Sequence, residues 1–338
     1  MLEQAGETAV IETDRYDVVV IGAGPAGLSA GLNLVRARRR VLVIDSNRPR
    51  HAATMMAHGF LTRDGTPPSE LRRLAREEYL AYPEAEHHLG LVQSVRALEV
   101  DAAEPMDEPY LTTGGRALLE VVASGLNGRP GRTVRTRSVL IATGLKETLP
   151  NIEGIRNFYG MGLFSCVQCD GYEYSDQPIA LIGETRDIAW RALLIAQWSR
   201  HLTVFTNGAD AINAGQAARL AEAGVRIEER PIEAIEGAKT GPTGIRVAGG
   251  EVLPISGGFV RPRWDPQLGF LEALHLDTDG WGLLVTDPSG RTSHAGVYAA
   301  GDVTSPGPQQ LIVAAGAGAR AAATINRDLI GIPTAQRR

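Results

Sequence analysis

The stretch Tyr16–Gly27, YDVVVIGAGPAG, decides the fold of this chain of 338 residues. Its first half predicts a short buried strand over 16–21, and its glycines fit the pattern GxGxxG at the start of a helix over 28–37. A second strand is predicted over 41–44 and ends at Asp45. Such glycines let the backbone approach a pyrophosphate, which the N–H groups of the helix N-terminus can bind. Asp45 stands where a carboxylate accepts hydrogen bonds from a ribose, so a 2′-phosphate is disfavoured in this site.

The same layout recurs later in the chain. A strand over 179–182, Gly183, a helix over 188–198 and a strand over 202–205 are predicted. Gly22 precedes Asp45 by 23 positions, and Gly183 precedes Thr206 by the same 23. Two copies of a dinucleotide-binding half-fold are the simplest explanation.

We therefore expect an α/β protein of two Rossmann-like three-layer domains, the second inserted into the first. The first segment of the outer domain covers 1–150, the middle domain 151–258, and the second segment of the outer domain 259–338. Stretches rich in Gly, Pro and Arg at 151–160 and 257–266 are predicted to cross between the domains.

Composition excludes several classes. The net charge of −5 argues against a nucleic-acid or anionic-membrane surface. Residues 1–14 are acidic and contain no apolar h-region, so a signal peptide is not expected. Apolar stretches at 18–35 and 311–325 are interrupted by glycines and polar residues, which argues against a membrane span. A cytoplasmic protein is expected.

The two cysteines of the chain, Cys166 and Cys169, lie three positions apart. In a reducing compartment such a CxxC pair is more often redox-active than structural, and the chain has no second CxxC to complete a zinc site, so no metal is expected. Thiol–disulfide exchange needs a nucleophilic outer thiolate and a good leaving inner one. Asp170 follows directly, and a buried carboxyl there could carry the proton that the exchange requires.

With these residues in place, the chain resembles the low-molecular-weight thioredoxin reductase family over nearly its full length. Four segments carry the resemblance: the pyrophosphate loop 22–27, the ATG motif in 141–144, the CxxCDG motif 166–171 and the second FAD motif 296–302. The resemblance implies bound FAD, a homodimer, and a thioredoxin-like protein or a small disulfide or dithiol as substrate. The implied FAD contacts are Gly22, Gly24, Pro25, Ala26, Gly27, Asp45, Ser46, Ala142, Thr143, Gly144, Gly301, Asp302, Gln309, Gln310 and Leu311.

The resemblance also implies roles at the redox centre. Cys169 would face the flavin, Cys166 would attack or release the external partner, and Asp170 would match the acid of the family. Asp302 would meet the ribityl-phosphate region. The helix that starts near Gln310 would point its positive end at the flavin and stabilise the anionic reduced form.

The middle domain departs from the family at the NADPH site. Thr185 replaces the second glycine of the fingerprint, and its side chain obstructs the approach of a pyrophosphate. Glu184 and Asp187 add negative charge, each opposing phosphate binding by on the order of 1 kcal/mol. The next strand ends in 205–207 (FTN), without the arginines that a 2′-phosphate needs. NADPH use is therefore not expected, and a second flavin in the middle domain is an alternative.

Segments 59–68, 196–199 and 303–310 also resemble a branch containing the dithiol oxidases of gliotoxin and holomycin biosynthesis. Those enzymes typically place His after CxxC, where this chain has Asp170. His51 and His58 precede a segment that runs beside the flavin in the family and could tune it or move protons. His87 and His88 are expected in a polar turn without a role, and Trp264 near the flavin.

Three functions remain open from the sequence. The first is a disulfide oxidoreductase moving two electrons between FAD and a dithiol or disulfide, with oxygen, ferredoxin or a second flavin as the other partner. The second is an NADPH-dependent thioredoxin reductase with a divergent NADPH site. The third is a non-catalytic flavin or nucleotide sensor.

Overall fold

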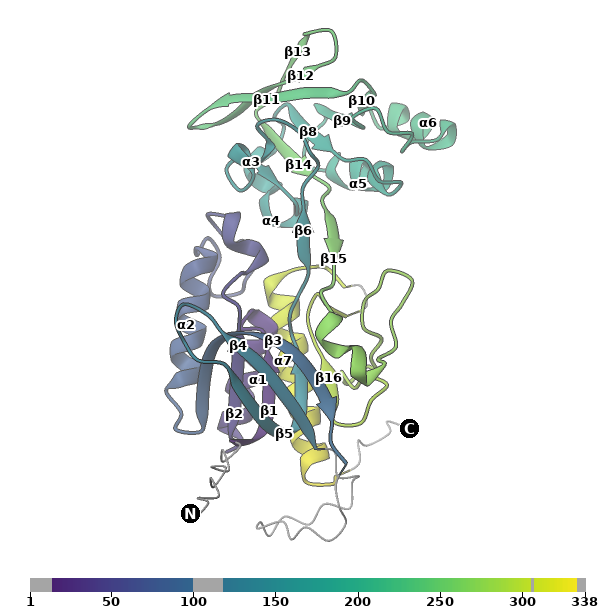
Figure 1. Ribbon diagram of the computed structural model, residues 1–338. Coiled ribbons are helices and arrows are strands. Elements are labelled where there is room, and N and C mark those ends of the chain that lie inside the picture. Colours follow the sequence, from purple (N-terminus) through teal and green to yellow (C-terminus); the bar gives the residue numbers. More distant parts are fainter. Residues whose placement is uncertain (1–13, 100–117, 305–306, 333–338) are drawn as a thin grey trace, which may run out of the picture.

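The computed structural model describes residues 14–99, 118–304 and 307–332 (Figure 1). The chain forms two α/β domains, and the second is inserted into the first, as predicted. We call residues 14–145 and 266–332 the outer domain, and residues 149–262 the middle domain. The N-terminal segment expected to lack a signal peptide lies outside the described residues except for Asp14, and Ser305 and Pro306 of the oxidase-like segment lie outside them too.

The outer domain is built on one six-stranded sheet, in the order β1-β2-β3-β4-β5-β16 with a further β1–β5 pairing. Strands β3, β2, β1, β5 and β16 run parallel through most of their pairings, while β4 pairs antiparallel with both of its neighbours. Its strands are β1 Arg15–Ile21, β2 Val41–Asp45, β3 Ala85–Ala97, β4 Leu119–Gly125, β5 Arg132–Ile141 and β16 Val297–Ala299. Its longer helices are α1 Pro25–Arg36, α2 Pro68–Leu80 and α7 Leu311–Leu329, and the short ones are η1 Arg50–Ala53 and η3 Gly269–Leu274.

Glycines allow α1 and α7 to approach each other closely. A Cβ on Gly318 of α7 would lie 2.0 Å from the carbonyl oxygen of Ala26 in α1. A Cβ on Gly27 would lie 1.9 Å from the oxygen of Gly22. The first contact packs the start of α1 against the interior of α7, and the second packs α1 against the loop that precedes it.

The middle domain contains a five-stranded parallel sheet in the order β10-β9-β8-β14-β7 and a three-stranded antiparallel sheet, β11-β12-β13. The strands are β7 Leu163–Phe164, β8 Ile179–Ile182, β9 Leu202–Phe205, β10 Arg226–Glu228, β11 Ile232–Ala238, β12 Gly241–Val247, β13 Val252–Pro254 and β14 Gly257–Val260. The helices are α3 Ile155–Phe158, α4 Val167–Asp170, η2 Tyr172–Tyr174, α5 Ile188–Ile195 and α6 Ala214–Glu222.

The predicted repeat is present in the backbone. The N–H of Gly22 donates to the oxygen of Ile44 at 2.8 Å, and the N–H of Gly183 donates to Phe205 at 3.1 Å. Each glycine therefore begins a turn beside the end of the neighbouring parallel strand. Thr206 occupies in the middle domain the position that Asp45 occupies in the outer one.

Two short strands connect the domains (Figure 1). They are β6 Lys146–Thr148 and β15 Arg263–Asp265, which pair antiparallel. The first crossing lies earlier than the predicted 151–160, where Ile155 and Phe158 of α3 are buried in the core of the middle domain. The proposed boundary after residue 258 falls inside β14, a strand of the middle sheet.

Some local predictions were wrong. The helix expected to reach residue 198 ends at Ile195. Single turns follow it, because the N–H groups of Gln197 and Trp198 donate to the oxygens three positions earlier. His87 and His88 lie in β3, paired with β2, because strand pairing overrides the polar local sequence.

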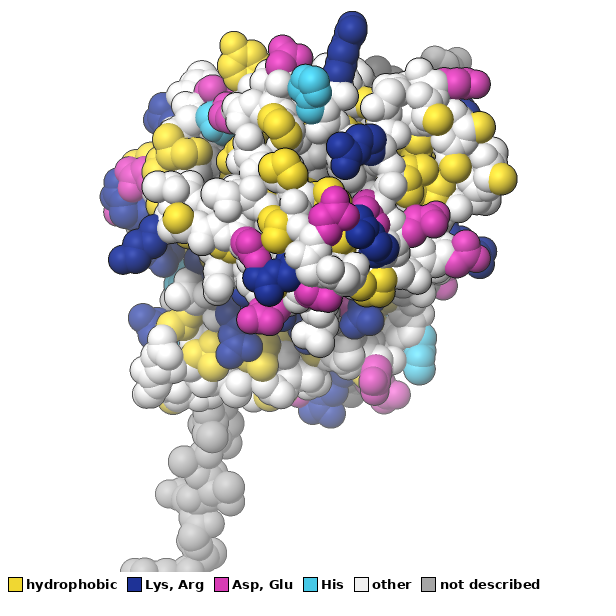
Figure 2. Space-filling view, turned by 90° about the horizontal axis from the view of Figure 1, so that it is seen from above, with side chains coloured by type: hydrophobic (Ala, Val, Ile, Leu, Met, Phe, Trp, Pro, Cys, Tyr) yellow, Lys and Arg dark blue, Asp and Glu magenta, His cyan; other side chains and the backbone are white. Residues whose placement is uncertain are grey.

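Within the described residues, no helix combines the length and the hydropathy that crossing a membrane requires. Figure 2 looks down on the middle domain, where basic, acidic and apolar side chains are interspersed. This face therefore presents no extended field of one sign.

Candidate active site

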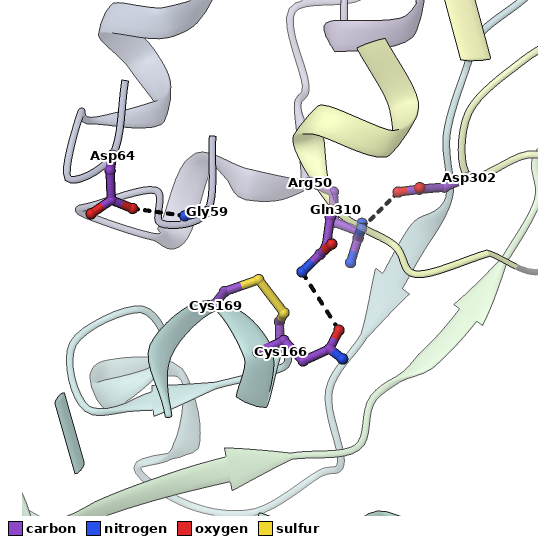
Figure 3. The surroundings of a disulfide bond; sticks show 8 residues. Arg50, Gly59, Asp64, Cys166, Cys169, Asp302 and Gln310 are labelled. Carbon is purple, nitrogen blue, oxygen red and sulfur yellow. Dashed lines mark hydrogen bonds and ion pairs between the residues drawn. A yellow bond between two sulfur atoms is a disulfide. The ribbon is translucent and has the colours of Figure 1, made fainter. Parts of the chain in front are cut away.

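The two cysteines form a disulfide at the junction of the domains. Cys166 is the N-cap of the short helix α4, and its carbonyl oxygen accepts the N–H of Asp170 at 3.2 Å. In Figure 3 the disulfide lies beneath the N-terminus of α7, and Gln310 there donates to Gln168 at 3.5 Å. A segment of the middle domain thus presents both sulfur atoms to the outer domain.

The residues predicted to hold FAD meet at one edge of the outer sheet. They follow the carboxyl ends of parallel strands, where open α/β sheets bind their ligands. Gly22 has φ +108°, and the N–H of Ala142 donates to Ile21 at 2.9 Å, which joins the first two segments. The hydroxyl of Thr143 is buried without a protein partner, a polar atom left available to a ligand. The predicted residues are Gly22 and Gly24 after β1, Pro25, Ala26 and Gly27 in α1, Asp45 and Ser46 at the end of β2, Ala142, Thr143 and Gly144 after β5, Gly301 and Asp302 after β16, and Gln309, Gln310 and Leu311 at the start of α7.

The start of α1 fits a pyrophosphate. Gly24 is its N-cap, Pro25 opens its first turn, and that turn contains neither a side-chain cap nor an acidic residue. A Cβ on Gly24 would meet no atom within 4 Å, so open space adjoins the free N–H groups. Backbone donors and an uncancelled helix dipole favour an anion there.

A pocket of about 390 Å³ adjoins the end of β2. Asp45 lines it together with His87, whose Nε2 is buried without a partner. Burial lowers the pKa of His87, so this imidazole stays neutral and can donate or accept a hydrogen bond. Arg72 of α2 forms an ion pair with Asp45 and donates to Asn47 at 2.8 Å. These groups fit the adenosine end of FAD.

The opposite end of the predicted FAD contacts is also charged. Arg50 of η1 forms an ion pair of 2.7 Å with Asp302, drawn in Figure 3. His51 lies beside them, and burial together with the charges of Arg72 and Arg50 lowers its pKa to about 4. His51 is therefore neutral near pH 7, which favours a hydrogen-bonding role over that of a cation.

Asp170 has the properties expected of an acid–base group. The residue is 8% exposed, and burial raises its pKa to about 7. The charge of His58 in the outer domain lowers this pKa and that of Glu173 raises it, each by less than burial does. A carboxyl with this pKa can both release and accept a proton near neutral pH.

Side chains of the protein itself close the second nucleotide turn. Asp187 accepts hydrogen bonds from Thr185 at 2.5 Å, Arg191 at 2.8 Å and Arg261 at 2.9 Å. Burial alone would raise the pKa of Asp187, but these three partners lower it to about 2. The expected repulsion from Asp187 is thus neutralised by two arginines, and Thr185 and Asp187 are held to each other. Glu184 is held by Asn207 at 2.7 Å.

Trp264 lies on the connecting strand β15 among cationic side chains. Its indole N–H donates to Glu147 of β6 at 2.9 Å. The guanidinium of Arg261 lies 4.3 Å from its ring centroid, that of Arg191 5.3 Å and that of Arg50 5.8 Å. Trp264 therefore links arginines of both domains at the connection.

Sequence reasoning missed Arg72, Arg191 and Arg261. Arg72 and Arg261 lie 27 and 74 positions from the carboxylates that they bind, so no local motif marks them. Arg191 lies four positions after Asp187, and that helical spacing was the available signal for it. A basic run in the amphipathic segment 68–80 was the available signal for Arg72. Among the residues that the structure describes, no group of three or more His, Cys, Asp or Glu side chains is arranged to hold a metal ion.

Comparison with known proteins agrees with this geometry. A profile of the pyridine nucleotide-disulphide oxidoreductase family matches residues 16–318. The protein HlmI, in its crystal structure, is 36% identical with a TM-score of 0.83, and the match covers 93% of this chain and 92% of that one. The thioredoxin reductase sirT of Leptosphaeria maculans is 27% identical over 336 residues, covering 95% of this chain and 97% of that protein.

Another relative matches a shorter part of the chain, at a higher sequence identity than sirT. A protein of Arthroderma benhamiae named a probable thioredoxin reductase is 31% identical over 196 residues, which covers 58% of this chain but 45% of that protein. The chain thus matches less than half the length of this relative. Because the family profile spans most of the chain and the matches to HlmI and sirT cover more than nine tenths of each protein, the chain belongs to the pyridine nucleotide-disulphide oxidoreductase family, as a thioredoxin-reductase-like, flavin-dependent disulfide oxidoreductase.

Proposed function

We propose that this enzyme exchanges two electrons between bound FAD and a dithiol or disulfide substrate through Cys166 and Cys169, without using NADPH. The observation that carries the proposal is the position of the disulfide. It lies at α4, beneath the start of α7 and beside the contact between Gln168 and Gln310. Bound FAD would supply the two-electron carrier. A thioredoxin-like protein and a small dithiol are both candidate substrates; a homodimer and a cytoplasmic location remain predictions.

The chain supplies the thiol chemistry. A substrate thiolate attacks Cys166, the S–S bond to Cys169 breaks, and Cys169 leaves as a thiolate. A second substrate thiolate then displaces Cys166, so the substrate becomes a disulfide and both cysteines are reduced. Asp170 accepts a proton from the substrate thiol or returns one to a cysteine thiolate, which its pKa of about 7 permits in either direction. The reverse sequence reduces a disulfide substrate.

The side chains of the middle domain support independence from NADPH. Asp187 accepts hydrogen bonds from Thr185, Arg191 and Arg261 at the turn where a pyrophosphate would bind. A nucleotide would have to break these bonds before its phosphates reached the backbone. The electron partner would then be oxygen, ferredoxin or a second flavin.

One observation favours a second candidate, an NADPH-dependent thioredoxin reductase with a divergent site. Arg191 and Arg261 bring two positive charges to the turn. If Asp187 released them, they could bind phosphate oxygens.

Anaerobic stopped-flow spectroscopy separates the candidates. We expect dithiothreitol to bleach the flavin absorbance and NADPH to leave it unchanged over the same interval. The Cys169→Ser variant should retain FAD but lose the response to dithiothreitol, which a non-catalytic sensor would not require. Fast bleaching by NADPH would refute the proposal and favour the second candidate.

A further inference from the structure

A loop of the outer domain reaches the redox segment. It runs over 54–67, between η1 and α2, and backbone hydrogen bonds from Ala57 to Thr66 at 3.0 Å and from Gly65 to Ala57 at 2.9 Å close it. Asp64 accepts the N–H of Gly59 at 2.8 Å, as Figure 3 shows near the disulfide. Hydrogen bonds among its own residues therefore hold this loop in a defined conformation.

His58 of this loop bridges the two domains. Its Nδ1 lies 3.6 Å from Asp64 in the same loop, and its Nε2 lies 3.7 Å from Glu173 in the middle domain. The imidazole is 26% exposed, whereas the side chains of Glu173 and Asp64 are 44% and 71% exposed, so water screens both ion pairs from the carboxylate side. Glu173 belongs to η2 and follows Asp170 by three positions. Among the described residues, three acidic groups interact with His58: Asp64, Glu173 and Asp170.

We propose that His58 is a positioning residue, which in its protonated form binds Asp64 and Glu173 together and holds the segment carrying Cys166, Cys169 and Asp170 against the outer domain. This inference rests on the proposed function, because it assigns to His58 the placement of the same redox pair.

The connection between the domains explains why such a contact matters. Two strands, β6 and β15, join them covalently, so the placement of the disulfide depends on contacts across the interface. The contact of Gln310 with Gln168 is uncharged and 3.5 Å long. The carbonyl oxygen of Ala53 approaches Gly160 so closely that a Cβ on Gly160 would lie 1.8 Å from that oxygen. This contact limits how closely the two domains approach but does not attract them. His58 adds an attraction that depends on its proton.

This dependence predicts a pH signature. An imidazole changes its charge between about pH 5 and pH 8. A protonated His58 attracts both carboxylates, and a neutral one does not. A role in packing alone would not depend on pH in this way.

The test compares His58→Gln with His201→Gln, an exposed histidine in the turn before β9, in the FAD-loaded enzyme. Bleaching of the flavin by dithiothreitol is followed without oxygen. We expect His58→Gln to slow bleaching by about 3-fold to 10-fold near pH 6 and by less than about 2-fold near pH 8. His201→Gln should match the unmodified enzyme at both values.

A double variant tests the partner. If His58 acts through Glu173, Glu173→Gln should slow bleaching near pH 6, and the double variant should be no slower than His58→Gln alone. Additive effects, a His58→Gln rate equal to that of His201→Gln, or an equal slowing at both pH values would overturn the inference.

A readout without turnover separates this inference from the proposed function. Hydrogen–deuterium exchange of the oxidised enzyme near pH 6 should be faster in segments 54–67 and 166–175 of His58→Gln than in the unmodified protein. Faster exchange together with a flavin that dithiothreitol cannot bleach in the unmodified enzyme would refute the proposed function and leave the bridge intact. Unchanged exchange in a working enzyme would refute the bridge alone.

Discussion

Replacing Asp170 by asparagine keeps the size of the side chain and removes its ability to ionise. Burial raises the pKa of this carboxyl from 3.8 to about 7, and the residue is 8% exposed. Since a tenfold change in an acid equilibrium corresponds to about 1.4 kcal/mol, ionising Asp170 in the fold costs roughly 4 kcal/mol more than in water. The enzyme tolerates this cost in stability at the group proposed to carry the proton.

The sign of the effect on stability follows from the protons bound. Between about pH 4 and pH 7 the carboxyl is protonated in the fold and ionised in the unfolded chain, so the unfolded chain binds fewer protons. The free energy of unfolding therefore decreases as the pH rises through this range. Asparagine does not titrate, so Asp170→Asn should gain roughly 4 kcal/mol relative to the unmodified protein between about pH 4 and pH 8.

Two assays measure this prediction. Urea unfolding of the oxidised, FAD-loaded proteins at several pH values gives the difference in stability, with the exposed Asp176→Asn as a matched control. Bleaching of the flavin by dithiothreitol gives the rate, which should fall by about 100-fold or more in Asp170→Asn and lose its titration near pH 7. An Asp170→Asn enzyme with the original rate and the original pH dependence would refute the assignment of Asp170 as the acid–base group.

Three further substitutions test the flavin site and the fold. Gly24→Ala should fold normally, because its Cβ meets no protein atom within 4 Å, yet it should bind FAD at least about 10-fold more weakly; Gly27→Ala, whose Cβ would lie 1.9 Å from a backbone oxygen, should instead fail to fold. Flavin absorbance and circular dichroism measure the two outcomes, and equal FAD content in Gly24→Ala would contradict the pyrophosphate site. Tyr79→Phe should destabilise the protein by about 1–3 kcal/mol in urea, because the buried hydroxyl lies 2.7 Å from the oxygen of Val41. The exposed Tyr172→Phe is its control, and equal stability of the two variants would argue against that hydrogen bond.

The local sequence was sufficient to predict the buried, mostly apolar strands that end at a glycine. The strands that lead to Gly22 and Gly183 were predicted within a residue of their observed ends, because both faces of a parallel strand are buried and nearly every side chain is apolar. The CxxC pair and Asp170 were also evident, because their chemistry depends on spacing along the chain. Elements with a mixed polar and apolar pattern were harder to predict. His87 and His88 lie in a strand because β2 pairs with them, and no periodicity in the sequence indicates that pairing.

The sequence by itself determined the two half-folds and the redox pair, since each depends on neighbours a few positions apart. It also predicted the nested domain order, because motifs of the outer domain occur at both ends of the chain. Only the tertiary structure decided which distant charges meet. Arg261 joins Asp187 across 74 positions, and Arg50 joins Asp302 across 252. His58 likewise meets Glu173 from the other domain. The physical reason is that an ion pair forms wherever folding brings opposite charges within about 4 Å, regardless of their separation along the chain.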